Sequence, residues 1–276
     1  MQYSDRLLGR HHPLVHRLRS LRRDARRRRA EGVLVAEGVH LAREALRSEA
    51  IIECVVASPR LEQTPEGRAL RAEIAGRGID LREADESLLD SLQDARSPQP
   101  ILAVVRVGTW SLDDALAWRG DATPPLIVVA DRVQDPGNLG GLLRTADAAG
   151  ATGFVCCGES ADLHHPRAVR ATMGSVFRVP AAAVDRTDAQ AALEKRGIRR
   201  IAAEPHRGTV YHQCDLTGAI ALLLGGEGRG LDPAWLERAD ERARIPMCPG
   251  VESLSVGAAA GVLLFEAARQ RQLWSG

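Results

Sequence analysis

The sequence of 276 residues contains little lysine, few aromatic residues and no long apolar run. Lys195 is the only lysine, so arginine supplies almost all of the positive charge. No apolar stretch approaches the roughly 18–20 residues that cross a bilayer, and none follows the basic N-terminus. We therefore expect neither a membrane span nor a signal peptide. Because only 3% of the residues are aromatic, stacking on aromatic side chains is expected to be a minor mode of ligand recognition.

Cysteine is also scarce, and its pattern excludes two kinds of site. The number is odd and no C-x-x-C pair occurs, which argues against a disulfide framework or a structural zinc site and fits a reducing cytoplasm. The two His-His pairs, at positions 11–12 and 164–165, lack a second ligand pair at metal spacing, so no metal is expected. We expect all five cysteines to be small buried residues: Cys54, Cys156, Cys157, Cys214 and Cys248.

Charge is abundant but unevenly distributed. The formal net charge is +1, yet residues 1–30 hold ten arginines against two aspartates, a local charge of +8, and the remainder carries −7. The pattern over 14–29 (LVHRLRSLRRDARRRR) predicts a helix with Leu14, Leu18 and Leu21 on one face. Such a run is either a solvated surface helix or an arm that contacts phosphate groups through guanidinium groups. The candidates for phosphate contacts are Arg17, Arg19, Arg22, Arg23 and Arg26.

Strands and helices alternate along the chain, as is typical of α/β domains. The first region, 1–107, predicts strands over 33–36, 51–57, 79–81 and 101–107 and helices over 39–47, 65–75 and 86–94. Residues 108–125 are expected to form a linker. In the second region, 126–276, fully apolar strands indicate a buried parallel sheet, followed by a long last helix over 254–272. These strands are expected over 126–130, 153–157, 175–180, 199–203, 219–225 and 243–247.

The first stretch that could carry chemistry is 131–150 (DRVQDPGNLGGLLRTADAAG). It follows a strand and therefore lies at the carboxyl edge of the sheet, where α/β proteins bind ligands. Asn138 is expected to cap the next helix, and Arg144, six residues further on, would approach the same site. Taken alone, these two residues also fit a plain helix cap and a surface charge.

Two later stretches follow strands in the same way. Residues 222–233 (LLLGGEGRGLDP) predict a glycine-rich turn around Glu227 that exposes backbone amides. This turn is neither G-x-G-x-x-G nor a P-loop, which argues against a dinucleotide-dependent oxidoreductase. Residues 244–270 lead from a strand through a short loop into a helix rich in small residues, where Ser253 and Ser255 fit helix caps.

In this order and spacing, the three stretches resemble the SpoU/TrmH branch of the SPOUT RNA methyltransferases. The element N-x-G-x-x-x-R-T-A-D-A-A-G matches Asn138–Gly150, and L-G-x-E-G matches Leu224–Gly228. The third element matches at Ile245–Met247 and at Ser253–Ser255. The first region is similar, over 33–46 (VLVAEGVHLAREAL), to the RNA-binding domain that many family members carry.

The resemblance implies two α/β domains, the second a parallel-sheet SPOUT fold whose C-terminal chain threads a loop to form a trefoil knot. It also implies a homodimer in which each site borrows residues across the interface. The implied cofactor is S-adenosylmethionine, and no metal is needed. By the match, the residues around the cofactor are Gly225, Ile245, Met247, Leu254 and Ser255.

The implied reaction transfers a methyl group to a ribose 2′-hydroxyl of RNA. Arg144 would hold the adjacent phosphate and stabilise negative charge on the oxygen, because a guanidinium stays protonated and is a poor base. Asn138 would orient the ribose or Arg144. By the same match, Glu227 would fix Arg144 or its own loop, and Ser253 would help to place the third stretch.

One position departs from the family pattern, because Ser255 stands where asparagine is usual and lacks its paired donor and acceptor. This departure, together with the arginine-rich arm, leaves open a non-catalytic RNA-binding or ribosome-assembly module. For an enzyme, the separate N-terminal domain favours 23S ribosomal RNA, with transfer RNA as the alternative. Some relatives with this domain plan confer resistance to ribosome-targeting antibiotics, a role that these residues do not distinguish.

Overall fold

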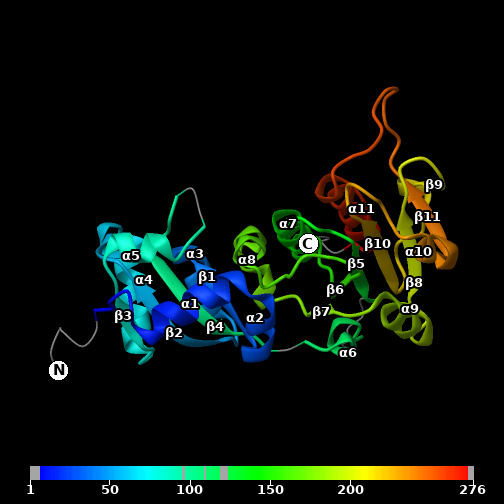
Figure 1. Ribbon diagram of the computed structural model, residues 1–276. Helices are drawn as coiled ribbons and strands as arrows, with labels where there is room; N and C mark the ends of the chain where they lie inside the picture. The colour runs from blue at the N-terminus through cyan, green and yellow to red at the C-terminus, as the bar shows by residue number, and fades with distance from the viewer. Residues whose placement is uncertain (1–6, 95–96, 109, 119–123, 273–276) are drawn as a thin grey trace. The chain divides into compact units, whose positions relative to one another are not determined.

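A computed structural model describes residues 7–94, 97–108, 110–118 and 124–272 (Figure 1). Its contacts divide the chain into two compact units, which are considered one at a time. The first unit contains residues up to Gly108 together with Asp162–Phe177, and the second contains the rest. The segment Asp162–Phe177 thus packs with the first unit, although it lies within the sequence region 126–276.

The first unit is built on a four-stranded sheet in the order β1-β4-β2-β3. β4 is antiparallel to both β1 and β2, whereas β2 and β3 are parallel. All five positions of β1 are buried, so helices cover both faces of the sheet there. The strands are β1 (Val33–Glu37), β2 (Ile51–Ala57), β3 (Leu81–Glu83) and β4 (Ile101–Arg106). The helices are α1 (Pro13–Arg23), α2 (Ala25–Glu31), α3 (Val39–Arg47), η2 (Pro59–Gln63), α4 (Pro65–Gly76), α5 (Glu86–Ser91), α8 (Pro166–Thr172) and η3 (Ser175–Phe177).

The single helix predicted over 14–29 is wrong, because the chain breaks at Asp24 into α1 and α2. Asp24 adopts an extended backbone, and its carboxylate accepts hydrogen bonds from the N–H groups of Arg26 and Arg27. An aspartate that can satisfy the free N–H groups of a new helix favours such a break. The expected apolar face of α1 is confirmed for Leu18 and Leu21, which are buried in the core.

Arg28 in α2 is buried, with 1% of its surface exposed. Its Nη2 and Nε donate to Asp162 Oδ2 at 2.6 and 2.9 Å, and its Nη1 donates to the carbonyls of Leu21 and Arg22. Arg28 therefore joins the junction of α1 and α2 to the segment that leads into α8. It serves the fold of this unit and is not available to a ligand.

Replacing Arg28 by methionine is expected to destabilise the protein by about 2 kcal/mol, the usual cost of leaving a charged hydrogen-bonding partner unpaired. The substitution keeps the aliphatic stem but leaves Asp162 without its cation. Urea unfolding followed by circular dichroism measures the loss. Arg29→Met, at an exposed neighbour, should change stability by less than about 0.5 kcal/mol. Equal midpoints for the two variants would contradict the structural role of Arg28.

The second unit is a seven-stranded sheet in the order β7-β6-β5-β10-β8-β11-β9, and every pairing is parallel. Its strands are β5 (Leu126–Asp131), β6 (Gly153–Cys157), β7 (Ala181–Ala183), β8 (Arg199–Ala203), β9 (Thr209–Val210), β10 (Ile220–Gly225) and β11 (Glu241–Arg244). Its helices are α6 (Leu112–Ala115), α7 (Pro136–Ala148), α9 (Arg186–Lys195), η4 (Tyr211–Gln213), α10 (Pro233–Arg238) and α11 (Val256–Gln270). β5 and β10 are buried along nearly their whole length, as their apolar sequences predict.

Helices cover both faces of this sheet. One face packs against α6, α9 and α10, with Trp235 and Leu193 among the buried side chains. α7 and α11 pack against each other and bury Leu143 and Leu263 among other apolar side chains (Figure 1). No described helix of either unit is long and apolar enough to cross a membrane.

Two local predictions for this region fail. Residues 175–180 do not form a strand, because 175–177 is a 3₁₀ turn and the next strand begins only after Pro180. Proline has no N–H to donate to a β-ladder, so pairing starts at Ala181. Cys248 is exposed rather than buried, because it lies in the loop between β11 and α11; the other four cysteines are buried, and all five are free thiols.

Candidate cofactor site

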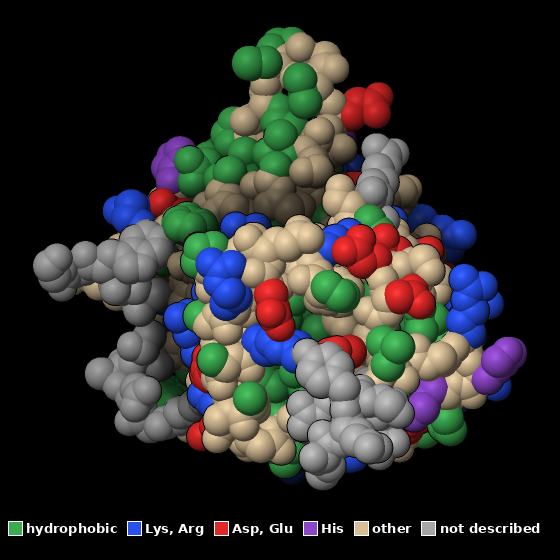
Figure 2. Space-filling model, turned by 90° about the vertical axis from the view of Figure 1, so that its left-hand side faces the viewer, with side chains coloured by type: hydrophobic (Ala, Val, Ile, Leu, Met, Phe, Trp, Pro, Cys, Tyr) green, Lys and Arg blue, Asp and Glu red, His purple; other side chains and the backbone are tan. Residues whose placement is uncertain are grey.

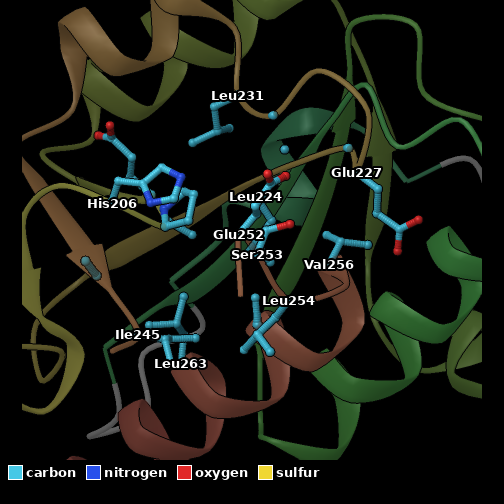
Figure 3. A pocket seen from close by; sticks show the side chains of 18 of the residues that line it. His206, Leu224, Glu227, Leu231, Ile245, Glu252, Ser253, Leu254, Val256 and Leu263 are labelled. Atoms are coloured by element: carbon cyan, nitrogen blue, oxygen red, sulfur yellow. The ribbon is translucent and has the colours of Figure 1, made fainter. Parts of the chain in front are cut away.

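A cavity of about 410 Å³ opens at the carboxyl edge of the second unit's sheet. Its walls come from the segments that follow β8, β10 and β11, which are neighbours in the sheet, and from α11. Figure 3 shows His206 and Leu231 on one side of the cavity and Ile245 and Leu263 on the other. Three chain segments far apart in the sequence thus meet at one place because their strands are parallel and adjacent.

The cavity combines an apolar lining with acidic side chains. Leucine, isoleucine and valine side chains form much of the wall, and Glu204, Glu227 and Glu252 also line the cavity. Glu204 pairs with Arg242 at 3.1 Å. Arg229 and His206 are lining residues too. Such a cavity suits a ligand of moderate size with an apolar or aromatic part and a positive charge.

At Gly225 and Gly226, the glycine-rich loop after β10 approaches other backbone too closely for a side chain. A Cβ atom on Gly225 would lie 2.1 Å from the backbone of Gly230, and one on Gly226 would lie 2.0 Å from the carbonyl oxygen of Arg132. Gly225, Gly226 and Gly230 all line the cavity. Glycine is needed at Gly225 and Gly226 for this close approach and at Gly230 for its φ of 60°, and it lets the loop present its backbone to a ligand.

Comparison with known proteins identifies the family. Residues 125–265 match the SpoU rRNA methylase family, and residues 12–103 match an MRM3-like substrate-binding domain. The chain belongs to the SpoU rRNA methylase family. The resemblance inferred from the three sequence elements is therefore confirmed, and the cavity lies within the matched SpoU region.

Three SpoU relatives illustrate the similarity. The 23S rRNA (guanosine(2553)-2′-O)-methyltransferase RlmP of Bacillus subtilis is 30% identical over 83% of this chain and 86% of its own length. The AdoMet-bound rRNA methyltransferase of Sinorhizobium meliloti is 31% identical, with a TM-score of 0.81 over 95% of this chain and 97% of that one. The SpoU methyltransferase AviRb of Streptomyces viridochromogenes, in complex with AdoMet, is 27% identical, with a TM-score of 0.82 over 95% of this chain and 100% of that one.

These similarities confirm the α/β class and the parallel-sheet SpoU domain. Both of the structures named here hold S-adenosylmethionine (AdoMet). The cavity fits this group on its own chemistry, because apolar walls suit an adenine ring, and Glu227 and Glu252, which pair with no arginine in the described chain, suit a sulfonium and an ammonium group.

Most of the cofactor residues expected from the SpoU elements line the cavity. Gly225, Ile245, Met247 and Leu254 do so. Ser255 is not among the lining residues; it is the N-cap of α11, and its hydroxyl accepts from the N–H of Ala258 at 3.3 Å.

The expected catalytic residues separate into two groups. Glu227 and Ser253 line the cavity, whereas Asn138 and Arg144 lie on α7 and do not. The prediction that Asn138 caps α7 is wrong, because the cap is Asp135, whose carboxylate accepts from the Asn138 N–H at 2.9 Å. Pro136 starts the helix three residues earlier than expected, since proline suits the first helical position. Arg144 is exposed and makes no ion pair with any described residue.

The arginines proposed for phosphate contacts differ in whether they already pair with groups of the protein. Arg17 pairs with Glu31 and Glu53 at 2.7 and 2.6 Å, and Arg22 donates to two backbone carbonyls. Arg19 donates to the Arg10 carbonyl at 3.3 Å. Arg23 and Arg26 are exposed and pair with no carboxylate in the described chain.

Sequence reasoning missed the cavity residues of the loop after β8 and one residue, Glu252, of the β11–α11 loop. Glu204 and His206 lie outside the three stretches, and Glu252 lies in the third stretch between its two matched parts, yet all three line the cavity. The position of 204–206 at the carboxyl end of a predicted strand was the available signal. Within the described residues, no group of three or more His, Cys, Asp or Glu side chains is arranged to hold a metal ion.

Proposed function

We propose that the protein is an S-adenosylmethionine-dependent methyltransferase that modifies a ribose 2′-hydroxyl of 23S ribosomal RNA. The observation that carries this proposal is the cavity, in which the second and third SpoU elements meet at the carboxyl ends of β10 and β11, the two strands that flank β8. The names of the relatives support the choice of RNA and of the 2′ position. Transfer RNA is the alternative substrate.

The bound cofactor supplies a methyl group already activated by the sulfonium. The protein then has to place the ribose oxygen in line with it, which Asn138 and Arg144 do from α7. Arg144 binds the adjacent phosphate and stabilises negative charge that develops on the oxygen. To Glu227 and Ser253, which line the cavity, we assign the placing of its loops.

Incubation of the protein with methyl-labelled S-adenosylmethionine and ribosomal RNA tests the proposal. Label is expected in dinucleotides that resist alkali, because a methylated 2′-oxygen cannot attack the neighbouring phosphate. Parallel reactions with 23S RNA and with transfer RNA separate the two substrates. Label on a base, or binding of RNA without any transfer, would refute the assignment; the latter result would favour an RNA-binding module.

We further propose a homodimer that works in the cytoplasm without a metal, with the trefoil knot of the family in its second domain. Exposed apolar side chains support the homodimer, because Val251 and Leu254 lie in the β11–α11 loop and Phe265 lies on α11. Figure 2 shows hydrophobic side chains on the projection at its top, which is the loop that stands highest in Figure 1. Domain limits of 1–107 and 126–276, joined by 108–125, are part of the same proposal.

We expect phosphate contacts from only part of the arginine-rich segment. Arg17, Arg27 and Arg28 already pair with carboxylates, so the local charge of +8 overstates the number of available cations. Arg23→Ala and Arg26→Ala should each reduce the salt dependence of RNA binding, measured as the slope of log K against log salt, by about 0.7–0.9. Arg47→Ala, at an exposed arginine on α3, should leave the slope unchanged. Equal slopes for all variants would contradict this assignment.

A further inference from the structure

A network of two carboxylates and two guanidinium groups adjoins the glycine-rich loop of the second unit. It joins Asp131, the last residue of β5, to Arg132, to Arg186 at the start of α9 and to Asp232, the N-cap of α10. Arg186 Nε and Nη2 donate to Asp131 Oδ1 at 3.2 and 3.0 Å. Arg186 Nη2 and Arg132 Nη1 each lie 3.3 Å from Asp232 Oδ2. Asp131 is fully buried, and the two guanidinium groups balance the two carboxylates.

Hydrogen bonds connect this network to the backbone of the loop over 225–232. Arg132 Nη2 donates to the Gly230 carbonyl at 3.1 Å, and the Asp232 N–H donates to Asp131 Oδ2 at 3.0 Å. The Gly226 N–H donates to the backbone carbonyl of Asp131 at 2.9 Å. Within the loop, the Gly230 N–H donates to the carbonyl of Gly226 at 2.8 Å. The loop is therefore held at both ends and across its middle, while Glu227, Arg229 and Leu231 line the cavity.

The backbone of Arg132 also helps to hold the loop over 225–232. Its φ of 59° lies in the left-handed region, which is unfavourable for a residue with a long side chain. Such a conformation persists where surrounding contacts hold it, and here both the guanidinium and the backbone of Arg132 contact the loop. Its carbonyl oxygen occupies the space that a Cβ on Gly226 would need.

We propose that Asp131 and Arg132 are positioning residues that hold the loop over 225–232 against the cavity and thereby set the affinity for S-adenosylmethionine. Neither residue lines the cavity, so both act through the loop. A loop that is fixed before the ligand arrives loses less conformational freedom on binding, which raises affinity. The proposal rests on the proposed function only for the identity of the ligand.

Arg132→Asn tests the proposal, because asparagine tolerates the left-handed backbone and the change removes only the guanidinium contacts. Calorimetry with S-adenosylmethionine is expected to show a Kd about tenfold higher, as for the loss of a charge-assisted hydrogen bond. In steady-state assays, KM for the cofactor should rise, while kcat at saturating cofactor and KM for RNA should stay within about twofold. Arg132→Lys, which keeps a cation at this position, should restore part of the affinity and replaces Arg132→Asn if that variant does not fold.

Arg200→Asn is the matched control. The side chain of Arg200 is about as buried as that of Arg132, at 14% and 16% exposure, and pairs with Asp240 at 2.9 Å. It lies near the amino end of β8, at the opposite edge of the sheet from the cavity. This variant should lower the melting temperature but leave the Kd for S-adenosylmethionine unchanged. A Kd at the unmutated value in the Arg132 variant, or an equal loss in the control, would overturn the positioning role; absence of binding by the unmutated protein would instead refute the proposed function.

Discussion

Arg144→Ala is expected to slow methyl transfer to RNA by about 100- to 1000-fold, the range seen when one group that stabilises a developing oxyanion is removed. S-adenosylmethionine should bind this variant with unchanged affinity. The physical reason is the separation seen in the structure, because Arg144 is exposed on α7 while the cavity is lined by other segments. Single-turnover transfer and calorimetry on the same preparation measure the two quantities independently.

Two further variants separate charge from geometry at this position. Arg144→Lys keeps a positive charge but loses the planar guanidinium group that binds a phosphate bidentately. Relative to Arg144→Ala, it should therefore restore RNA binding more than it restores the rate of methyl transfer. Arg196→Ala, at a residue near the end of α9 that pairs with Asp113, should transfer at the normal rate. Near-normal transfer by Arg144→Ala would refute the role assigned to this residue.

Gly226→Ala is expected to weaken S-adenosylmethionine binding by at least about 100-fold, equivalent to about 2.7 kcal/mol. The added Cβ would lie 2.0 Å from the carbonyl oxygen and 2.9 Å from the carbonyl carbon of Arg132. Both atoms belong to backbone, so no change of rotamer relieves the clash, and the loop has to leave its place in the cavity wall. Calorimetry measures the Kd, and circular dichroism checks that the sheet remains folded.

Gly228→Ala is the matched substitution in the same loop. A Cβ at Gly228 would meet no atom within 4 Å, and this residue does not line the cavity. The Kd of the Gly228→Ala variant for S-adenosylmethionine should stay within about twofold of the unmutated value. If Gly226→Ala binds the cofactor as tightly as Gly228→Ala does, the loop does not form the cofactor site in the way proposed.

Some features of the protein follow from local sequence. Apolar runs such as those in Leu126–Asp131 and Ile220–Gly225 predict buried parallel strands. In a strand that is covered on both faces, side chains on either side are buried, so polar and apolar residues do not alternate. The helix over 39–47 has the predicted bounds. The second and third SpoU elements supplied Gly225, Glu227, Ile245 and Leu254, all of which line the cavity, since each element follows a strand that ends at the same edge.

Other features depend on contacts between distant residues. The ten arginines of residues 1–30 are equivalent in sequence, yet only the folded chain places Arg28 against Asp162 and Arg17 against Glu53 while leaving Arg23 exposed. A guanidinium group pairs with whichever carboxylate the fold brings near, and local pattern contains no information about that partner.

By itself, the sequence determined the α/β class, the parallel sheet, the family and the three elements at the strand ends, because these depend on hydrophobic pattern and short-range spacing. Only the tertiary structure decided that Glu204, His206 and Glu252 complete the cavity and that Arg132 holds the loop beside it. Those arrangements result from the order β5-β10-β8-β11 in the sheet, which brings distant segments together; Arg132 and Gly230, for example, are 98 residues apart in the sequence.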